Sequence, residues 1–121
     1  MSTAREISES CWEAESRGDI DAVLTHFHPD ATYQAPDGPR NGIDEIRGMY
    51  EFYGSTQGGL ASIEIVAEYG DDERAAIEFA AVITAPDGAR LGVGGVSVVR
   101  IRDGKFEFVR TYEDQPTPEG D

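Results

Sequence analysis

Three side chains are our candidates for proton transfer: the carboxyls of Glu15 and Glu113 and the phenol of Tyr33. A carboxyl that lies among aromatic rings loses solvation, which raises its pKa and makes it a general acid or base near neutral pH. Glu15 gains such a setting if it faces inward beside Trp12, but it can equally point outward near Arg17. Tyr33 is also compatible with ordinary strand packing, and Glu113 with a hydrophilic strand end.

Other reactive residue types are sparse. Cys11 is the single cysteine, so one chain can form neither a disulfide nor a thiolate-rich metal site. His26 and His28 are two residues apart, a spacing that points them in different directions on a helix. Ser97 has no adjacent histidine, so we interpret it as pocket lining and not as an activated nucleophile. We therefore expect no metal site and no cofactor.

Length and charge exclude several classes of partner. The 121 residues are enough for one domain with one core, and the formal net charge of -14 would repel phosphate backbones and anionic lipid. We therefore expect no nucleic acid and no membrane partner. No apolar run approaches the roughly 20 residues of a membrane span, and the first ten residues lack the apolar centre of a signal peptide. The sequence predicts a cytoplasmic protein.

The elements that position these side chains are marked by capping and stop signals. Thr3 and Glu6 form a possible capping box for a first helix that ends at Gly18. Asp19 can cap a short second helix, which we expect Pro29 to stop, and residues 31–35 alternate as a strand. A third helix opens at residues 41–42. Its apolar face recurs at spacings of three and four and comprises Ile43, Ile46, Tyr50 and Tyr53.

The second half of the chain predicts a largely antiparallel meander. Strand-like runs fall near residues 60–69, 74–84, 89–101 and 105–113, and Gly- and Asp-rich turns separate them. Residues 115–121 contain two prolines and almost nothing apolar, so we expect a flexible acidic tail.

The third of these runs is apolar on both alternating faces, so something must cover each face. One face would meet the helices. The other, with Val96 and Val98, would meet Phe106, Phe108 and a second subunit, which predicts a homodimer through the outer sheet face. The alternative is a thick monomer core.

Two segments, GDIDAVLTHFHPDATYQAP and NGIDEIRGMYEFY, together with this order of elements, resemble the SnoaL-like branch of the nuclear transport factor 2-like superfamily. The resemblance covers roughly Ala4 to Asp114, and we assign residues 1–114 to a single SnoaL-like domain. It implies an α+β fold: a cone-shaped barrel in which a curved, mostly antiparallel sheet wraps around N-terminal helices and encloses a small-molecule pocket.

The resemblance also allows enzyme types on this fold to be tested by position. Ketosteroid isomerases would need a carboxylate base at Ala35, with oxyanion donors at Cys11 and Ser97, so that site is missing. Limonene-type epoxide hydrolases share only Tyr33; the other matching positions are Ala35, Phe79, Ala81 and Thr111. Polyketide cyclases use a carboxylate near the middle of the last strand, where Glu113 is the nearest candidate, two residues from the matching position.

The same alignments imply an aromatic, mostly apolar pocket wall, which suits a hydrophobic ligand. The sheet would supply Tyr33, Ala35, Phe79, Ala81, Gly95, Ser97, Val109 and Thr111, and the helices Trp12, Glu15, Tyr50 and Tyr53. The resemblance therefore implies a cofactor-free isomerase, cyclase or dehydratase for a carbonyl-bearing substrate of polyketide, steroid or terpenoid type. Glu15 or Glu113 would be the acid or base, and Tyr33 would polarise an oxygen. The alternative is a non-catalytic ligand-binding or dimerisation module of the same fold.

Overall fold

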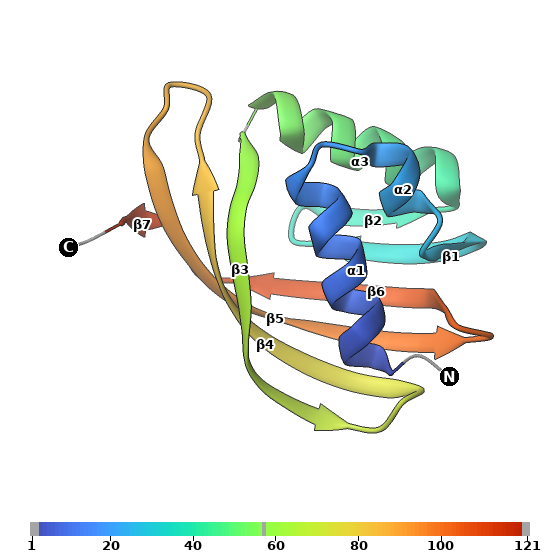
Figure 1. Cartoon of the computed structure of the whole chain (residues 1–121). Helices are drawn as coiled ribbons and strands as arrows, with labels where there is room; N and C mark the ends of the chain where they lie inside the picture. The colour runs from blue at the N-terminus through green and yellow to red at the C-terminus, as the bar shows by residue number, and fades with distance from the viewer. Residues whose placement is uncertain (1–2, 57, 120–121) are drawn as a thin grey trace.

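A computed structural model describes residues 3–56 and 58–119 as a curved sheet with helices on its inner side (Figure 1). The helices are α1 (Ala4–Ser16), α2 (Ile20–Leu24) and α3 (Ile43–Thr56). The strands are β1 (Phe27–Ala35), β2 (Gly38–Asn41), β3 (Gly59–Gly70), β4 (Arg74–Thr84), β5 (Arg90–Arg102), β6 (Lys105–Glu113) and β7 (Thr117–Pro118). None of the described helices is long and apolar enough to cross a membrane.

The predicted capping box opens α1. The backbone amide of Glu6 donates to Thr3 Oγ1 at 3.1 Å, and the Glu6 side chain accepts from the Thr3 backbone. The predicted buried face of Ile7, Cys11 and Ala14 is confirmed. This face anchors α1 on the sheet, so the neighbouring stripe of the same helix borders the space between the two.

The second helix ends earlier than the sequence predicts. Gly18 adopts a φ of 71°, and Asp19 caps α2 as expected. However, α2 ends at Leu24 and β1 already begins at Phe27, so Pro29 lies inside the strand and is not the stop signal. The Thr25 hydroxyl donates to the Ala22 carbonyl at 2.7 Å, which satisfies one of the free carbonyls at the helix end and allows this early termination.

The short strand β2 was not predicted, because a segment with Gly38 and Pro39 reads as a loop. It pairs antiparallel with β1, and Pro39 lies opposite Gln34. Proline is tolerated there because β2 is an edge strand, where a missing N–H costs no ladder bond. Gly42 follows with a φ of 89° and turns the chain into α3, as the sequence predicts.

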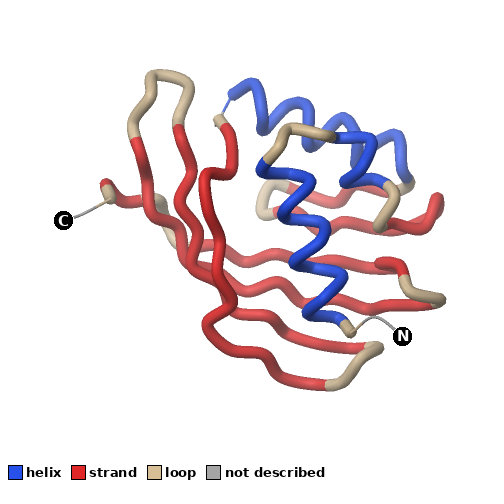
Figure 2. The backbone as a smooth tube through the Cα atoms, in the orientation of Figure 1, coloured by secondary structure: helices blue, strands red, loops and turns tan. Residues whose placement is uncertain are grey.

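The strand order is β2-β1-β6-β5-β4-β3, and β7 pairs with β5 off this path. All described pairs are antiparallel except β1 with β6, so the predicted mostly antiparallel meander is confirmed. Figure 2 shows the strands bending around the helices without closing into a complete barrel. The predicted cone-shaped α+β fold is therefore confirmed, with an unclosed sheet. The core lies between the sheet and the helices, where Ile46 and Ile77 are fully buried.

The outer face of the sheet differs from the prediction at one aromatic residue. Phe106 is buried and its ring centroid lies 5.1 Å from that of Phe27, so it faces the core. A register shift between Arg100 and Ile101 places Phe106 opposite Ile101. Because such a shift changes the alternation of faces, Phe108 alone of the two phenylalanines remains beside the outer surface.

Part of the expected tail has a defined place. Thr117–Pro118 pairs with β5, and the Glu119 carboxylate accepts a hydrogen bond from Arg90 Nε at 2.7 Å. The prolines that suggested a loose segment are compatible with a two-residue edge strand. Flexibility of the segment stays a prediction, and residues 120–121, like residues 1–2 of the expected domain, lie outside the described residues.

Candidate functional site

A cavity of about 540 Å³ lies between α1, α3 and the inner face of the sheet. This volume is within the usual range for small-molecule sites. Most of the predicted wall is present: Trp12, Glu15, Tyr33, Ala35, Tyr50, Tyr53, Phe79, Ala81, Ser97, Thr111 and Glu113. The other described lining residues are Gly18, Ile20, Val23, Pro36, Met49, Glu51, Gly54, Gly58, Gly59, Leu60, Ile63, Ile83, Val93 and Pro116.

Glu15 is the carboxyl that α1 directs into this cavity. It lies four residues after the buried Cys11 and three after Trp12, which also lines the cavity, so the helix that anchors on the sheet also turns Glu15 inward. Arg17 does not hold it outward, since that guanidinium pairs with Glu13 and Asp19. Burial raises the Glu15 pKa from 4.5 to about 7, and the negative charge of Glu113 adds to the shift.

A chain of three hydroxyls lies on the sheet wall. The Tyr33 hydroxyl is 2.9 Å from Thr111 Oγ1, which is 3.2 Å from Ser97 Oγ. These residues come from adjacent strands β1, β6 and β5, and Ser97 is directly opposite Thr111 in the ladder. Burial raises the pKa of Tyr33 above its ordinary value, so the phenol stays protonated and can donate to a ligand oxygen.

Glu113 lies at the end of β6, two residues beyond Thr111 and therefore on the same face of the strand. The residue is exposed, but its carboxyl borders the cavity, and partial burial raises its pKa. The cavity thus has the Glu15 carboxyl inside and the Glu113 carboxyl at its edge, and Glu51 of α3 is the third carboxyl among its described lining residues.

The aromatic wall is held by ring contacts. The Trp12 and Phe79 centroids are 5.7 Å apart, and those of Tyr33 and Tyr50 are 6.1 Å apart in a T-shaped arrangement. Phe79 lies close to β5 because position 95 is glycine, where a Cβ would meet the Phe79 ring at 2.7 Å. This close approach sets how far the ring extends into the cavity.

Not every predicted lining residue contributes its side chain in the expected way. Val109 is buried in the core and is not among the described lining residues, and neither is Gly95. Tyr53 lines the cavity, but its hydroxyl donates to Asp37 Oδ1 at 2.6 Å, outside the group formed by Tyr33 and its partners. Tyr53 therefore contributes its ring and not its hydroxyl.

The sequence prediction also missed part of the wall. The omitted side chains are the aliphatic residues Ile20, Val23, Met49, Leu60, Ile63, Ile83 and Val93. Alternation along β3 indicates Ile63 and Ile65 as an inward pair, which is the signal that could have found this side. Strict alternation would place Leu60 on the opposite face of β3 from Ile63. The register shift between Leu60 and Ser62 brings Leu60 to the same wall.

No group of three or more metal-ligating side chains occurs in residues 3–56 and 58–119. The two histidines have other contacts: His26 Nε2 lies 2.8 Å from Ser10 Oγ, and His28 Nε2 lies 2.5 Å from the Arg102 carbonyl oxygen. The absence of a cofactor stays a prediction.

Comparison with known proteins adds a family and a fold. A family model described as a SnoaL-like domain matches residues 9–109. No curated protein gives a significant match. A putative isomerase from Bacillus subtilis is 18% identical over 92% of this chain and 86% of that one, with a TM-score of 0.81.

Two further solved structures show the same likeness. TerC, co-crystallised with polyporic acid, is 19% identical over 91% of this chain and 90% of its own, with a TM-score of 0.79. A hypothetical protein with a ketosteroid isomerase-like fold from Catenulispora acidiphila DSM 44928, in complex with trimethylamine, is 21% identical over 92% and 86%, with a TM-score of 0.77. At these identities the likeness shows the fold alone.

Proposed function

The chain belongs to the SnoaL-like domain family of the nuclear transport factor 2-like superfamily, and from that premise we propose that its cavity is an active site. The proposed enzyme is a cofactor-free isomerase, cyclase or dehydratase. Its substrate is a hydrophobic, carbonyl-bearing small molecule of polyketide, steroid or terpenoid type. The aromatic and aliphatic wall supports the hydrophobic substrate, and the Glu15 carboxyl supports the acid–base chemistry.

These three reaction classes share a first step that Glu15 can perform. Its carboxylate accepts a proton from the carbon next to a substrate carbonyl, and the C–H electron pair forms the new carbon–carbon double bond. The carbonyl oxygen then carries the developing negative charge, and the Tyr33 hydroxyl stabilises it by donating a hydrogen bond. Glu15 returns the proton at another carbon in an isomerisation. In a dehydration, Glu113 protonates the departing hydroxyl.

One observation carries this proposal: the Glu15 carboxyl lines the cavity with no ion-pair or hydrogen-bond partner among the described side chains, and burial there raises its pKa to about 7. At neutral pH such a group is about half ionised, so the same side chain is available both as base and as acid. A carboxylate with the ordinary pKa of about 4.5 would be a weaker base and would remove the proton next to the carbonyl less readily.

The test is exchange of substrate protons for deuterium. Steroid, terpenoid and aromatic polyketide ketones are incubated with the protein in D₂O, and loss of the proton signal next to the carbonyl is followed by NMR. We expect at least one class to exchange, and Glu15→Gln to slow exchange by about 10²- to 10⁴-fold, as is usual when a general base is removed. Glu64→Gln, which removes an exposed carboxylate from the outer side of β3, is the control and should leave the rate unchanged.

A non-catalytic binding module of the same fold is the second candidate. The observation that favours it is the composition of the wall: Ala35, Phe79 and Ala81 line the cavity, and by the sequence resemblance these positions hold catalytic groups in limonene-type epoxide hydrolases. The exchange experiment separates the two candidates, since a binding module would bind a ketone and leave its proton exchange at the uncatalysed rate.

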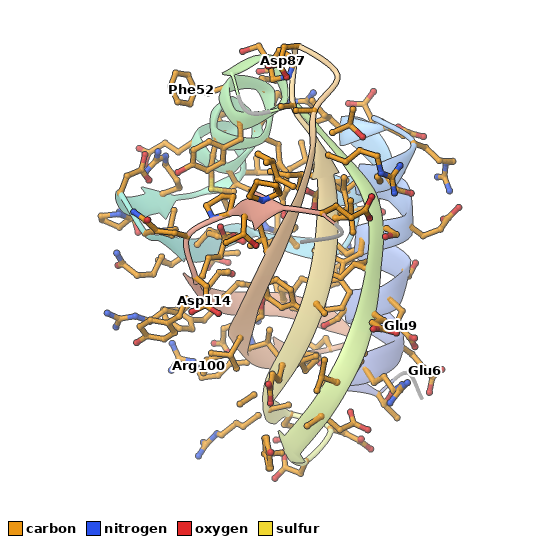
Figure 3. The ribbon with its side chains drawn as sticks, turned by 90° about the vertical axis from the view of Figure 1, so that its left-hand side faces the viewer. Glu6, Glu9, Phe52, Asp87, Arg100 and Asp114 are labelled. Carbon is orange, nitrogen blue, oxygen red and sulfur yellow. The ribbon has the colours of Figure 1, made fainter. Side chains whose placement is uncertain are left out.

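The outer face of the sheet supports a second part of the proposal, a homodimer. Val98 is 36% exposed and Tyr112 is 50% exposed, and Figure 3 shows Arg100 on this outer side. The Arg100 guanidinium lies 4.6 Å from the centre of the Phe108 ring. We propose that a second copy of the chain covers this surface, because exposed apolar side chains lie there beside an arginine that already contacts an aromatic ring.

A cytoplasmic location is likewise part of the proposal, and cell fractionation tests it.

A further inference from the structure

We propose that the cavity selects ligands that carry a cationic nitrogen on an apolar frame, with Glu15 as the counter-charge and the aromatic rings as the cation-binding wall. This inference rests on the proposed function, because it concerns the same site. It narrows the substrate class from any hydrophobic carbonyl compound to one that also contains an amine or a quaternary ammonium group.

The first argument is the charge of the wall. Its described lining residues include three carboxyls, Glu15, Glu51 and Glu113, and no lysine, arginine or histidine. Two arginines that adjoin lining residues in the sequence or contact them have other partners: Arg17, next to Gly18, pairs with Glu13, and Arg40 pairs with Asp37 at 3.1 Å. A ligand that enters this cavity therefore meets negative charge that no described side chain neutralises. An anionic ligand would be repelled, and a cationic one attracted.

The second argument is the unsatisfied state of Glu15 itself. Within the described residues its side chain has neither a hydrogen-bond partner nor an ion pair, although the residue is half-buried at the cavity wall. A buried carboxylate without a partner is costly, and the cost is relieved when a cation binds beside it. The protein thus holds one half of an ion pair, and the cavity leaves space for the other half.

The third argument is the arrangement of the rings. Trp12 and Phe79 form one contact pair in the wall, Tyr33 and Tyr50 form a second, and Tyr53 adds a fifth ring. An aromatic face attracts a cation through its quadrupole, and groups of several rings are a known means of binding alkylated ammonium ions. Rings and carboxyl together recognise a hydrophobic cation better than either does alone.

Binding should be coupled to the ionisation of Glu15. The titratable groups that face it are Glu113 from β6, Tyr33 from β1, Tyr50 from α3 and Cys11 from its own helix. Burial raises the pKa of the two phenols and the thiol, so these groups stay neutral near pH 7. The pKa of Glu113 is also raised, and its ionisation acts in the same direction as that of Glu15. Cation affinity should therefore rise with pH.

Two probes of nearly identical shape test the charge preference: phenyltrimethylammonium and tert-butylbenzene. Trp12 is the single tryptophan and lines the cavity, so its fluorescence reports binding of either probe to the full chain. At pH 8 we expect the ammonium ion to bind at least about tenfold more tightly than the hydrocarbon, a preference of about 1.4 kcal/mol. Its affinity should rise about tenfold between pH 6 and pH 8, as the ionised fraction of a carboxyl with a pKa of about 7 does.

Variants assign the preference to the proposed groups. Glu15→Gln should remove most of the ammonium preference and its pH dependence while the hydrocarbon binds as before. Glu64→Gln, which removes one exposed carboxylate from the outer side of β3, should change neither and controls for the net charge. Unchanged hydrocarbon binding also shows that the Gln variant is folded.

Equal affinity for the two probes, or no binding of either, would overturn the inference. The same holds if the ammonium preference persists undiminished in Glu15→Gln. These results are independent of the exchange experiment: a charge-selective cavity that fails to exchange ketone protons removes the proposed enzyme only, and catalysis without charge preference removes this inference only.

Discussion

Replacing Glu15 by glutamine should make the protein more stable at neutral pH, because the native carboxyl is held where ionisation is unfavourable. Its pKa is about 7 in the folded protein and 4.5 in the reference state of an exposed glutamate. The folded state therefore binds the proton more tightly than the unfolded state. A group of this kind leaves stability unaffected below about pH 4.5, and it lowers stability progressively as the pH rises through 7.

The size of this destabilisation follows from the two pKa values of Glu15. The change from 4.5 to about 7 corresponds to about 3 kcal/mol of unfolding free energy at 1.36 kcal/mol per pKa unit, and the full loss is reached above pH 7. Glutamine has nearly the same shape and never ionises, so it removes this term. The difference in unfolding free energy between Glu15→Gln and the native chain should rise by a few kcal/mol between pH 4.5 and pH 8. The constant part of the difference reflects the substitution itself and does not depend on pH.

Urea unfolding at half-unit pH steps measures this difference. The native chain has many other carboxylates, and the comparison between two chains cancels their contribution. Glu64→Gln is the control, because Glu64 is exposed on the outer side of β3 and no described ion pair involves it. A difference for Glu15→Gln that stays flat from pH 4.5 to pH 8 would show that the carboxyl is solvated, and would refute the reasoning.

Three further predictions concern other parts of the structure. Tyr33→Phe removes a hydrogen bond to Thr111 and should cost about 1 kcal/mol by urea unfolding; it should also slow ketone proton exchange, and an unchanged exchange rate would exclude Tyr33 as the oxygen donor. Gly95→Ala places a Cβ against the Tyr112 carbonyl oxygen and 2.7 Å from the Phe79 ring, and should cost about 1–3 kcal/mol; Gly48→Ala, where a Cβ would meet no atom within 4 Å, should not destabilise. Val98→Lys should lower the mass measured by sedimentation from that of a dimer to that of a monomer, and a monomeric native chain would contradict the proposed interface.

The sequence indicated the fold through local signals that depend on few neighbours. The Thr3–Glu6 capping box, the positive φ of Gly18 and the Asp19 cap were all readable, because each is decided within one or two turns of chain. The four long strands were readable for the same reason. The strand β2 could not be predicted from the sequence. Its proline is tolerated because β2 lies at the edge of the sheet, and that position depends on how all the strands are ordered.

The site shows the same division. Alternation and resemblance placed Tyr33 and Thr111 in the wall, and resemblance alone suggested Glu15; the structure has all three lining the cavity. Leu60 and Phe106 depend on register shifts in their ladders, which no residue type marks in the sequence. Whether Glu15 faced inward or toward Arg17 was open because both arrangements suit a helix end. The salt bridge between Arg17 and Glu13 settles where that guanidinium lies.

The most direct test of the central claim is the titration of the Glu15 side-chain carboxyl itself. A sample labelled with ¹³C in glutamate is followed by NMR from pH 4 to pH 9, and Glu15→Gln identifies the signal by its disappearance. The proposed acid–base role requires a midpoint near 7, as the burial of this carboxyl in the cavity wall predicts. A midpoint near 4.5 would mean that water solvates Glu15, and would contradict both the proposed catalysis and its physical cause.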